Sequence, residues 1–143
     1  MKLVNQGRYI LSTDPVCGTN GLGSCVGLAV YHGNWFIAHI DCEAIVKKKG
    51  DPMAQKITDY VKNRLNQILG PCGSPNVHAI GNFTTFEAIA IVQGITDWVN
   101  GHTTIVHNAW DGFQIKGDGT FAPLGHEANN DNGTGPFTVP ENP

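Results

Sequence analysis

The sequence has few charged residues and no long apolar run. Charged side chains make up 15% of the 143 residues, the formal net charge is -3, and the only cluster of one sign is "KKK" at 47–49. With so little positive charge, a nucleic-acid partner is not expected, and the three lysines indicate a solvated approach to a helix. No stretch reaches the roughly 18 apolar residues of a membrane span. A membrane partner is therefore not expected either.

An export signal is also missing from the amino terminus. "MKLVNQGRYILS" has one early lysine but no apolar segment after it. We therefore expect a chain that is cytoplasmic as synthesised. Delivery into another cell would need a route that does not depend on a signal peptide.

Cysteine is scarce, and its spacing does not suggest a metal site. The four cysteines include no Cys-x-x-Cys pair, and they lie at positions 17, 25, 42 and 72. A domain of this size without a signal peptide rarely needs disulfides, so reduced thiols are expected. "HIDC" pairs His39 with Cys42, but no second ligand pair has the spacing typical of zinc. We predict that the protein uses no metal and no cofactor.

The hydrophobic pattern predicts one α/β domain over residues 1–124. Strands are expected at 8–12 and 76–82 and in three short runs at 103–109, 112–116 and 120–124. "CVGLAVYH" and "NWFIAHID" predict a hairpin with a Gly-Asn turn. Helices are expected at 51–70, between Asp51 and Gly70, and at 84–101, opened by a Thr84-x-x-Glu87 capping box. The fold class is a mixed, largely antiparallel sheet with two main helices packed on it.

The last part of the chain has a different composition. From Gly125 onward the sequence consists mainly of Asn, Gly and Pro with few apolar residues. Such a composition is typical of a segment that lies on the surface or is disordered. We predict a polar tail over residues 125–143.

The predicted hairpin raises the question of whether Cys25 and His39 meet. They are 14 residues apart (39 − 25). A three-residue loop centred on His32 would pair them directly, and one centred on Gly33 would make them diagonal neighbours on one face. A two-residue Gly33-Asn34 turn would send them to opposite faces. An odd loop, or a compensating bulge, is therefore required if the two are to interact.

A neighbouring thiol and imidazole could perform nucleophilic catalysis. A paired imidazolium lowers the pKa of a cysteine, and the thiolate can attack an acyl or amide carbon. The glycines at 18, 21 and 23 would let backbone N–H groups approach a substrate closely. The N–H groups around Gly23 and Ser24 would then form an oxyanion pocket. A third group should orient the imidazole, and Thr19 and Asp41 are the candidates. The alternative is that Cys25 and His39 simply fill the core.

The segment "GLGSCVGLAVYHGNWFIAHI" resembles the signature of the chemoreceptor glutamine deamidases (CheD). That family shares a sandwich fold and a Cys–His geometry with the catalytic domain of the cytotoxic necrotizing factor toxins and with Burkholderia lethal factor. "HID" after a tryptophan-containing strand is similar to the histidine segment of the last of these. In deamidases with a threonine in the triad, the threonine precedes the cysteine by six residues, which is position 19 here (25 − 6).

The resemblance implies Cys25 as nucleophile, His39 as base and acid, and Thr19 as the group that orients His39. It covers roughly residues 17–43. It implies a hydrolase that deamidates glutamine, or asparagine, in a protein substrate. The sequence after His39 departs from the receptor deamidases, which favours a toxin-like effector over a chemotaxis enzyme. The alternatives are a chemoreceptor deamidase, an amidase acting on an amino-terminal asparagine or a small amide, and a non-catalytic binding module on the same fold.

Overall fold

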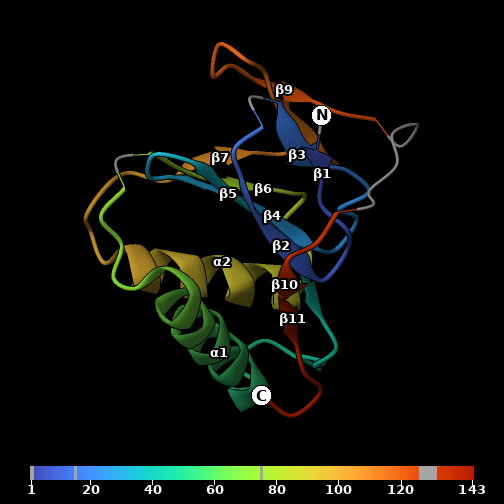
Figure 1. The fold of residues 1–143 in the computed structure, drawn as a ribbon. Helices are drawn as coiled ribbons and strands as arrows, with labels where there is room; N and C mark the ends of the chain where they lie inside the picture. Colours follow the sequence, from blue (N-terminus) through green and yellow to red (C-terminus); the bar gives the residue numbers. More distant parts are fainter. Residues whose placement is uncertain (1, 15, 75, 126–131) are drawn as a thin grey trace.

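The computed structural model describes residues 2–14, 16–74, 76–125 and 132–143, which form three layers (Figure 1). Helices α1 (Pro52–Leu69) and α2 (Phe86–Val99) make one outer layer. A seven-stranded sheet lies in the middle, and a four-stranded sheet covers its other face. The predicted α/β class, with two helices on a mostly antiparallel sheet, is confirmed. The separate small sheet is an addition that the residue pattern did not distinguish.

The strands of the large sheet run in the order β10, β2, β5, β4, β6, β7, with β11 also beside β5. Their bounds are Gly135–Pro136, Arg8–Ser12, Trp35–Cys42, Val26–Tyr31, Asn76–Ile80, Val106–Asn108 and Thr138–Val139. The small sheet has the order β1 (Lys2–Leu3), β3 (Cys17–Thr19), β8 (Phe113–Ile115) and β9 (Phe121–Pro123). Pairing is antiparallel except for β1 with β3, β6 with β7 and β11 with β5.

The hairpin β4–β5 is buried on both faces and separates two cores. Val26, Leu28 and Val30 belong to the core under the helices. Cys25 and Ala29 belong to the core between the two sheets. Because successive side chains of a strand alternate between faces, this apolar run serves both cores.

Helix α1 has the capping residues predicted from the sequence, whereas the N-cap of α2 differs from the prediction. The carboxylate of Asp51 accepts the N–H of Met53 at 2.9 Å, and Gly70 ends α1 with φ of 73°. Helix α2 is capped by Thr85, whose hydroxyl accepts from Ala88 N at 3.0 Å. The predicted Thr84–Glu87 capping box is therefore wrong, because the Glu87 carboxylate bonds elsewhere, to the N–H of Val46.

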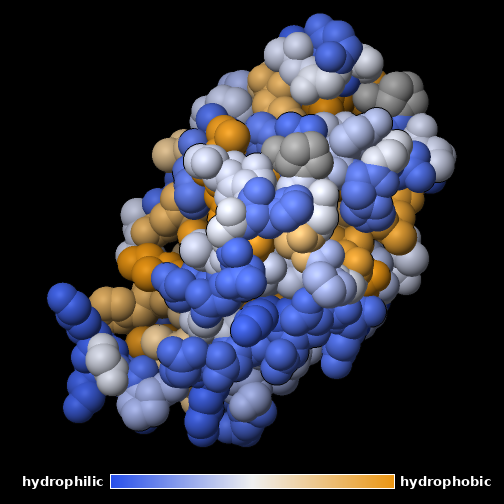
Figure 2. Space-filling model, turned by 90° about the vertical axis from the view of Figure 1, so that its left-hand side faces the viewer, coloured by the Kyte–Doolittle hydropathy of each residue, from blue (hydrophilic) through white to orange (hydrophobic). Residues whose placement is uncertain are grey.

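The helices pack closely because α2 carries a glycine at their contact. A Cβ at Gly94 would lie 2.6 Å from the carbonyl oxygen of Thr58 and 2.7 Å from Cβ of Val61. A side chain there would hold the two helices apart. The lower part of the face shown in Figure 2 is mostly hydrophilic, whereas α2 exposes the apolar side chains of Phe86 and Ile89. Neither helix in the described part of the chain is long and apolar enough to cross a membrane.

The predicted polar tail is wrong for residues 135–139. Strand β10 pairs with β2, and β11 pairs with β5. Between them, Phe137 is fully buried in the core under the helices, as is Val139. Two apolar side chains in a short polar segment anchor it, because each finds a site in a core that distant parts of the chain have built. Residues 126–131 of the predicted tail lie outside the described part of the chain.

Candidate functional site

The imidazole of His39 lies between the two sheets and bonds Thr19. His39 is on β5 of the large sheet, Thr19 is on β3 of the small one, and both are buried. Thr19 Oγ1 is 2.8 Å from Nδ1 of His39 and donates its proton to the carbonyl oxygen of Val4, also at 2.8 Å. A hydroxyl has a single proton to donate, so Nδ1 of His39 must be the donor toward Thr19. The Nδ1–H tautomer of His39 follows.

This tautomer leaves Nε2 of His39 with a lone pair. Nε2 is buried and has no hydrogen-bond partner among the described residues. Burial lowers the pKa of His39 from 6.5 to about 4, against the opposing effect of the carboxylates of Asp41 and Asp111. His39 is therefore a neutral imidazole at neutral pH, with Nε2 available to accept a proton.

The hairpin loop has an odd number of residues, as the hypothesis requires. Tyr31 pairs with Trp35, so residues 32–34 form a three-residue loop centred on Gly33, rather than a two-residue Gly-Asn turn. Gly27 is directly opposite His39. Cys25, two residues before Gly27, therefore lies on the same face and diagonal to His39. The structure selects the diagonal alternative over direct pairing.

In this register the direct partner of Cys25 is Asp41. The Cys25 thiol donates to Oδ1 of Asp41 at 3.5 Å, and the same oxygen accepts the N–H of Cys42 at 2.8 Å. Asp41 was a candidate for orienting the imidazole, but Thr19 bonds the His39 ring and Asp41 bonds the thiol. Since Nε2 of His39 has no partner, the thiol is not hydrogen-bonded to it in this state.

The environment of Cys25 favours the protonated thiol. Burial, together with the charge and the hydrogen bond of the Asp41 carboxylate, raises the pKa of Cys25 from 9.0 to about 12. The expected lowering of this pKa by an imidazolium is therefore not found, because His39 is uncharged and the nearest charge is an anion. The resting pair is a neutral thiol and a neutral imidazole.

The loop before Cys25 is exposed at Gly23 and Ser24, and two hydrogen bonds fix its conformation. The N–H of Gly23 donates to Asp111 Oδ1 at 2.9 Å, and the N–H of Cys25 donates to the carbonyl oxygen of Leu22 at 2.6 Å. Of the N–H groups expected to form an oxyanion pocket, that of Ser24 has no acceptor among the described residues. Gly23 would first have to release Asp111.

Two residues that bond the loop before Cys25 could not be predicted from the sequence. Asn82, after β6, donates its amide to the carbonyl oxygen of Gly23 at 3.1 Å, and Asp111, before β8, accepts from Gly23 as described. Both are more than fifty residues from Gly23 in the chain. Only the tertiary fold brings them to the loop before Cys25.

His39 and Cys42, which the sequence places together in "HIDC", do not form a pair of metal ligands. The two residues are three positions apart on one strand, which places their side chains on opposite faces. Cys42 contacts the core under the helices, whereas His39 bonds Thr19 on the other side. They cannot ligate one ion.

The five predicted site residues thus fall into two groups. His39 and Cys25 share one face at the open end of the hairpin, where Thr19 of the small sheet bonds His39, and Gly23 and Ser24 form the exposed loop beside them. The arrangement offers a nucleophile, a base and a group that orients the base. No protein-family model and no curated protein sequence matches this chain.

Proposed function

We propose that the protein is a cysteine-dependent amidohydrolase that deamidates glutamine, or asparagine, side chains of a protein substrate. The observation that carries the proposal is the Thr19–His39 hydrogen bond, which leaves the buried Nε2 of His39 without a partner on the face that holds Cys25. A nucleophile, a base and a residue that fixes the base's tautomer are what acyl transfer requires. The resemblance to the cysteine glutamine deamidases supports the choice of substrate.

The first step starts from the neutral pair. Rotation of the Cys25 side chain away from Asp41 brings its sulfur toward His39. The sulfur attacks the carboxamide carbon while Nε2 of His39 takes the thiol proton. The negative charge that develops on the carboxamide oxygen is met by the Ser24 N–H.

The second half of the reaction uses the same imidazole. The imidazolium of His39 gives its proton to the departing nitrogen, and ammonia leaves as the thioester forms. Neutral His39 then takes a proton from water, whose oxygen attacks the thioester carbon. The C–S bond breaks, the carboxylic acid leaves, and His39 returns the proton to the sulfur of Cys25. The sum is carboxamide plus water giving carboxylic acid plus ammonia, without a cofactor.

The carboxylates near the pair stabilise the charged intermediate. Asp41 and Asp111 both act to raise the pKa of His39, so they favour the imidazolium once it has formed. Burial opposes this in the free protein. Their contribution grows when His39 accepts a proton during the reaction.

The test is proteome-wide detection of deamidated sites. A lysate is incubated in water enriched in heavy oxygen with the wild type, Cys25→Ser or Cys72→Ser, and mass spectrometry identifies glutamines that become labelled glutamates. Cys72 is distant in the fold, on the loop after α1. We expect labelled sites with the wild type and Cys72→Ser and none with Cys25→Ser. The same sites in all three samples would refute the proposal.

The second candidate is a non-catalytic binding module. The raised pKa of Cys25 and the occupied N–H groups of Gly23 and Cys25 favour it. Hydroxylamine separates the two, because it intercepts a thioester and converts the reacting glutamine to a hydroxamate. A hydroxamate formed by the wild type but not by His39→Gln supports the enzyme, and its absence alongside stable substrate binding supports the module.

A further inference from the structure

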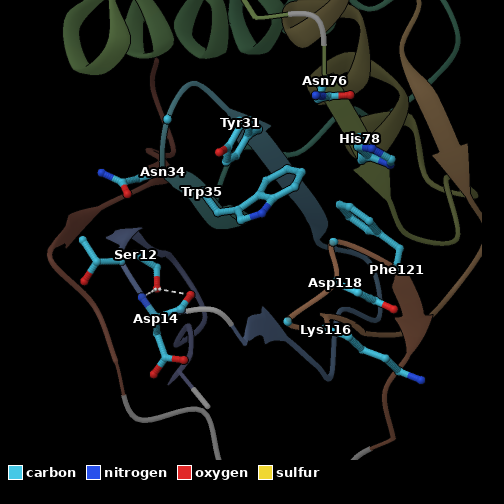
Figure 3. A pocket seen from close by; sticks show the side chains of 14 residues that line it. Ser12, Asp14, Tyr31, Asn34, Trp35, Asn76, His78, Lys116, Asp118 and Phe121 are labelled. Carbon is cyan, nitrogen blue, oxygen red and sulfur yellow. Dashed lines mark hydrogen bonds between the residues drawn. The ribbon is translucent and has the colours of Figure 1, made fainter.

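A cavity of about 500 Å³ lies at the tip of the β4–β5 hairpin (Figure 3). The loop after β2, the β8–β9 turn and β6 complete its walls. Strand β5 begins at this cavity with Trp35 and reaches the candidate site six residues later at Asp41, a span of about 20 Å. The cavity therefore cannot hold the amide that Cys25 would attack, and its ligand is a separate question.

Aromatic rings form one wall of the cavity. Trp35 lies 5.0 Å from Tyr31 and 5.3 Å from Phe121, centroid to centroid, and Phe121 stacks on His78 at 3.8 Å. Figure 3 shows the Trp35 ring in the middle of this group. Tyr31 is 38% exposed and Trp35 is half-buried. Because the rings already pack against one another, they present a preformed apolar surface to a ligand.

Uncharged polar groups line the cavity on either side of that surface. Asn34 and Asn76 are both exposed and lie on either side of the Trp35 ring in Figure 3. Each amide can donate and accept hydrogen bonds. Gly33 and Gly117 have nothing within 4 Å of where a Cβ would stand. No side chain therefore narrows the cavity entrance at Gly33 or Gly117, which leaves room for a ligand there.

The charged groups of the lining do not favour an ionic ligand. Lys116 is the single lysine or arginine among the lining residues, too little for a phosphate-rich ligand. The carboxylates of Asp14 and Asp118 accept backbone N–H groups of their own loops, from Val16 and Thr120, both at 2.9 Å. The rings contact each other rather than surround a gap, so they do not form the cage that binds a quaternary ammonium.

A peptide strand is also disfavoured. Strand β4 is paired with β5 and β6, and β5 is paired with β2 and β4, so neither offers a free edge at the cavity. Strand β9, which carries Phe121, is the edge of the small sheet, but it has three residues and ends in Pro123, which has no N–H to donate. Recognition by strand addition needs such an edge. The remaining ligand class has an apolar face, many hydroxyls and no charge.

We propose that this cavity binds a neutral saccharide, with the apolar face of a pyranose ring on Tyr31 and Trp35 and its hydroxyls bonded to the amides of Asn34 and Asn76. The volume is in the range of small-molecule sites. The saccharide is either free or attached to a protein. The proposal does not depend on the deamidase function.

The first test uses saturation-transfer NMR and tryptophan fluorescence with maltose, cellobiose, lactose and chitobiose. We expect saturable binding of at least one of them at millimolar concentration, with Tyr31→Ala and Asn76→Ala each weakening it about tenfold. Phe86→Ala is the matched control, because Phe86 is an exposed aromatic residue at the start of α2. It should bind as the wild type does.

The second test distinguishes the two sources of sugar. Ovalbumin before and after enzymatic removal of its glycans is compared with the free disaccharides as ligands. Binding of intact ovalbumin only would assign the site to protein-attached glycans, and binding of disaccharides only to free sugars. No binding in any arm, unchanged binding in both variants, or binding of tetramethylammonium in place of sugar would overturn the proposal.

Discussion

Thr19 Oγ1 lies 2.8 Å from Nδ1 of His39 and donates to the carbonyl oxygen of Val4, so one hydroxyl fixes the tautomer of the imidazole. The three groups come from the small sheet, the large sheet and the segment after β1. Their order along the hydrogen bonds runs from the Nδ1–H of His39 to Thr19 and from Thr19 to Val4. These two hydrogen bonds decide whether Nε2 of His39 carries a proton, and the proposed reaction of Cys25 depends on that.

The first prediction concerns Thr19→Val. The substitution keeps the shape of the side chain but leaves the buried Nδ1–H of His39 and the carbonyl of Val4 without partners. We expect a loss of about 1–3 kcal/mol in the free energy of unfolding. Deamidation should fall together with loss of the Nδ1–H tautomer, which nitrogen NMR shifts of His39 report. Thr19→Ser retains the hydroxyl and should keep the tautomer; if Thr19→Val keeps it too, the hydrogen-bond argument is wrong.

The second prediction concerns acid stability. His39 has a folded-state pKa of about 4 and an ordinary value of 6.5. Below pH 6.5 the unfolded chain binds a proton at this residue that the folded chain refuses, so stability is full above 6.5 and falls as the pH drops toward 4. The loss should reach roughly 3 kcal/mol. Denaturant unfolding measured across this interval should show a shallower pH dependence in His39→Gln, and an equal slope in both proteins would contradict the assignment.

The third prediction concerns the reactivity of the thiol. Because burial and Asp41 raise the pKa of Cys25 to about 12, its alkylation by iodoacetamide should still accelerate as the pH rises beyond 9.0. Asp41→Asn removes the repelling charge and should increase the rate at a fixed pH. Peptide mass spectrometry reports Cys25 separately, with glutathione as the reference thiol. Rapid labelling of the free wild type at pH 6 would instead indicate a thiolate.

The fourth prediction concerns the carboxyl-terminal segment. The carbonyl of Phe137 accepts the N–H of Asp41 at 3.3 Å, and its ring is fully buried. Phe137→Ala should cost about 3–5 kcal/mol of stability, because it leaves a cavity in the core under the helices. It should also lower deamidation, since β11 holds the strand that carries Asp41 and His39. Glu141→Ala, at an exposed position nearby, should change neither.

The fifth prediction concerns the contact of the two helices. Gly94→Ala places a methyl group 2.6 Å from the carbonyl oxygen of Thr58, where it cannot fit without moving α1. We expect destabilisation by about 1–3 kcal/mol, despite the higher helix propensity of alanine. Asn63→Ala, at an exposed position of α1, reports the gain in helix propensity alone. Thermal unfolding compares the two, and a stabilised Gly94→Ala would show that the helices do not pack as described.

The local elements followed from the sequence because their causes are local. Asp51 and Gly70 enclose the periodic apolar residues of α1, and the apolar runs around Gly33 form a hairpin because their side chains must alternate between two cores. The loop length was left open by the residues. A two-residue turn and a three-residue loop are both accessible to "HGN", and the pairing of β5 with β2 and β4 selects the register.

The residue pattern and the resemblance name the candidates for the proposed reaction, namely Cys25 and His39 on one hairpin and Thr19 before it. The tertiary structure decided how they are joined. The small sheet brings Thr19 to the His39 ring, the register gives Cys25 the carboxylate of Asp41, and Phe137 finds its place in a distant core. Side-chain alternation and caps act over a few residues. Burial, tautomer and thiol pKa depend on groups that only the folded chain brings into contact.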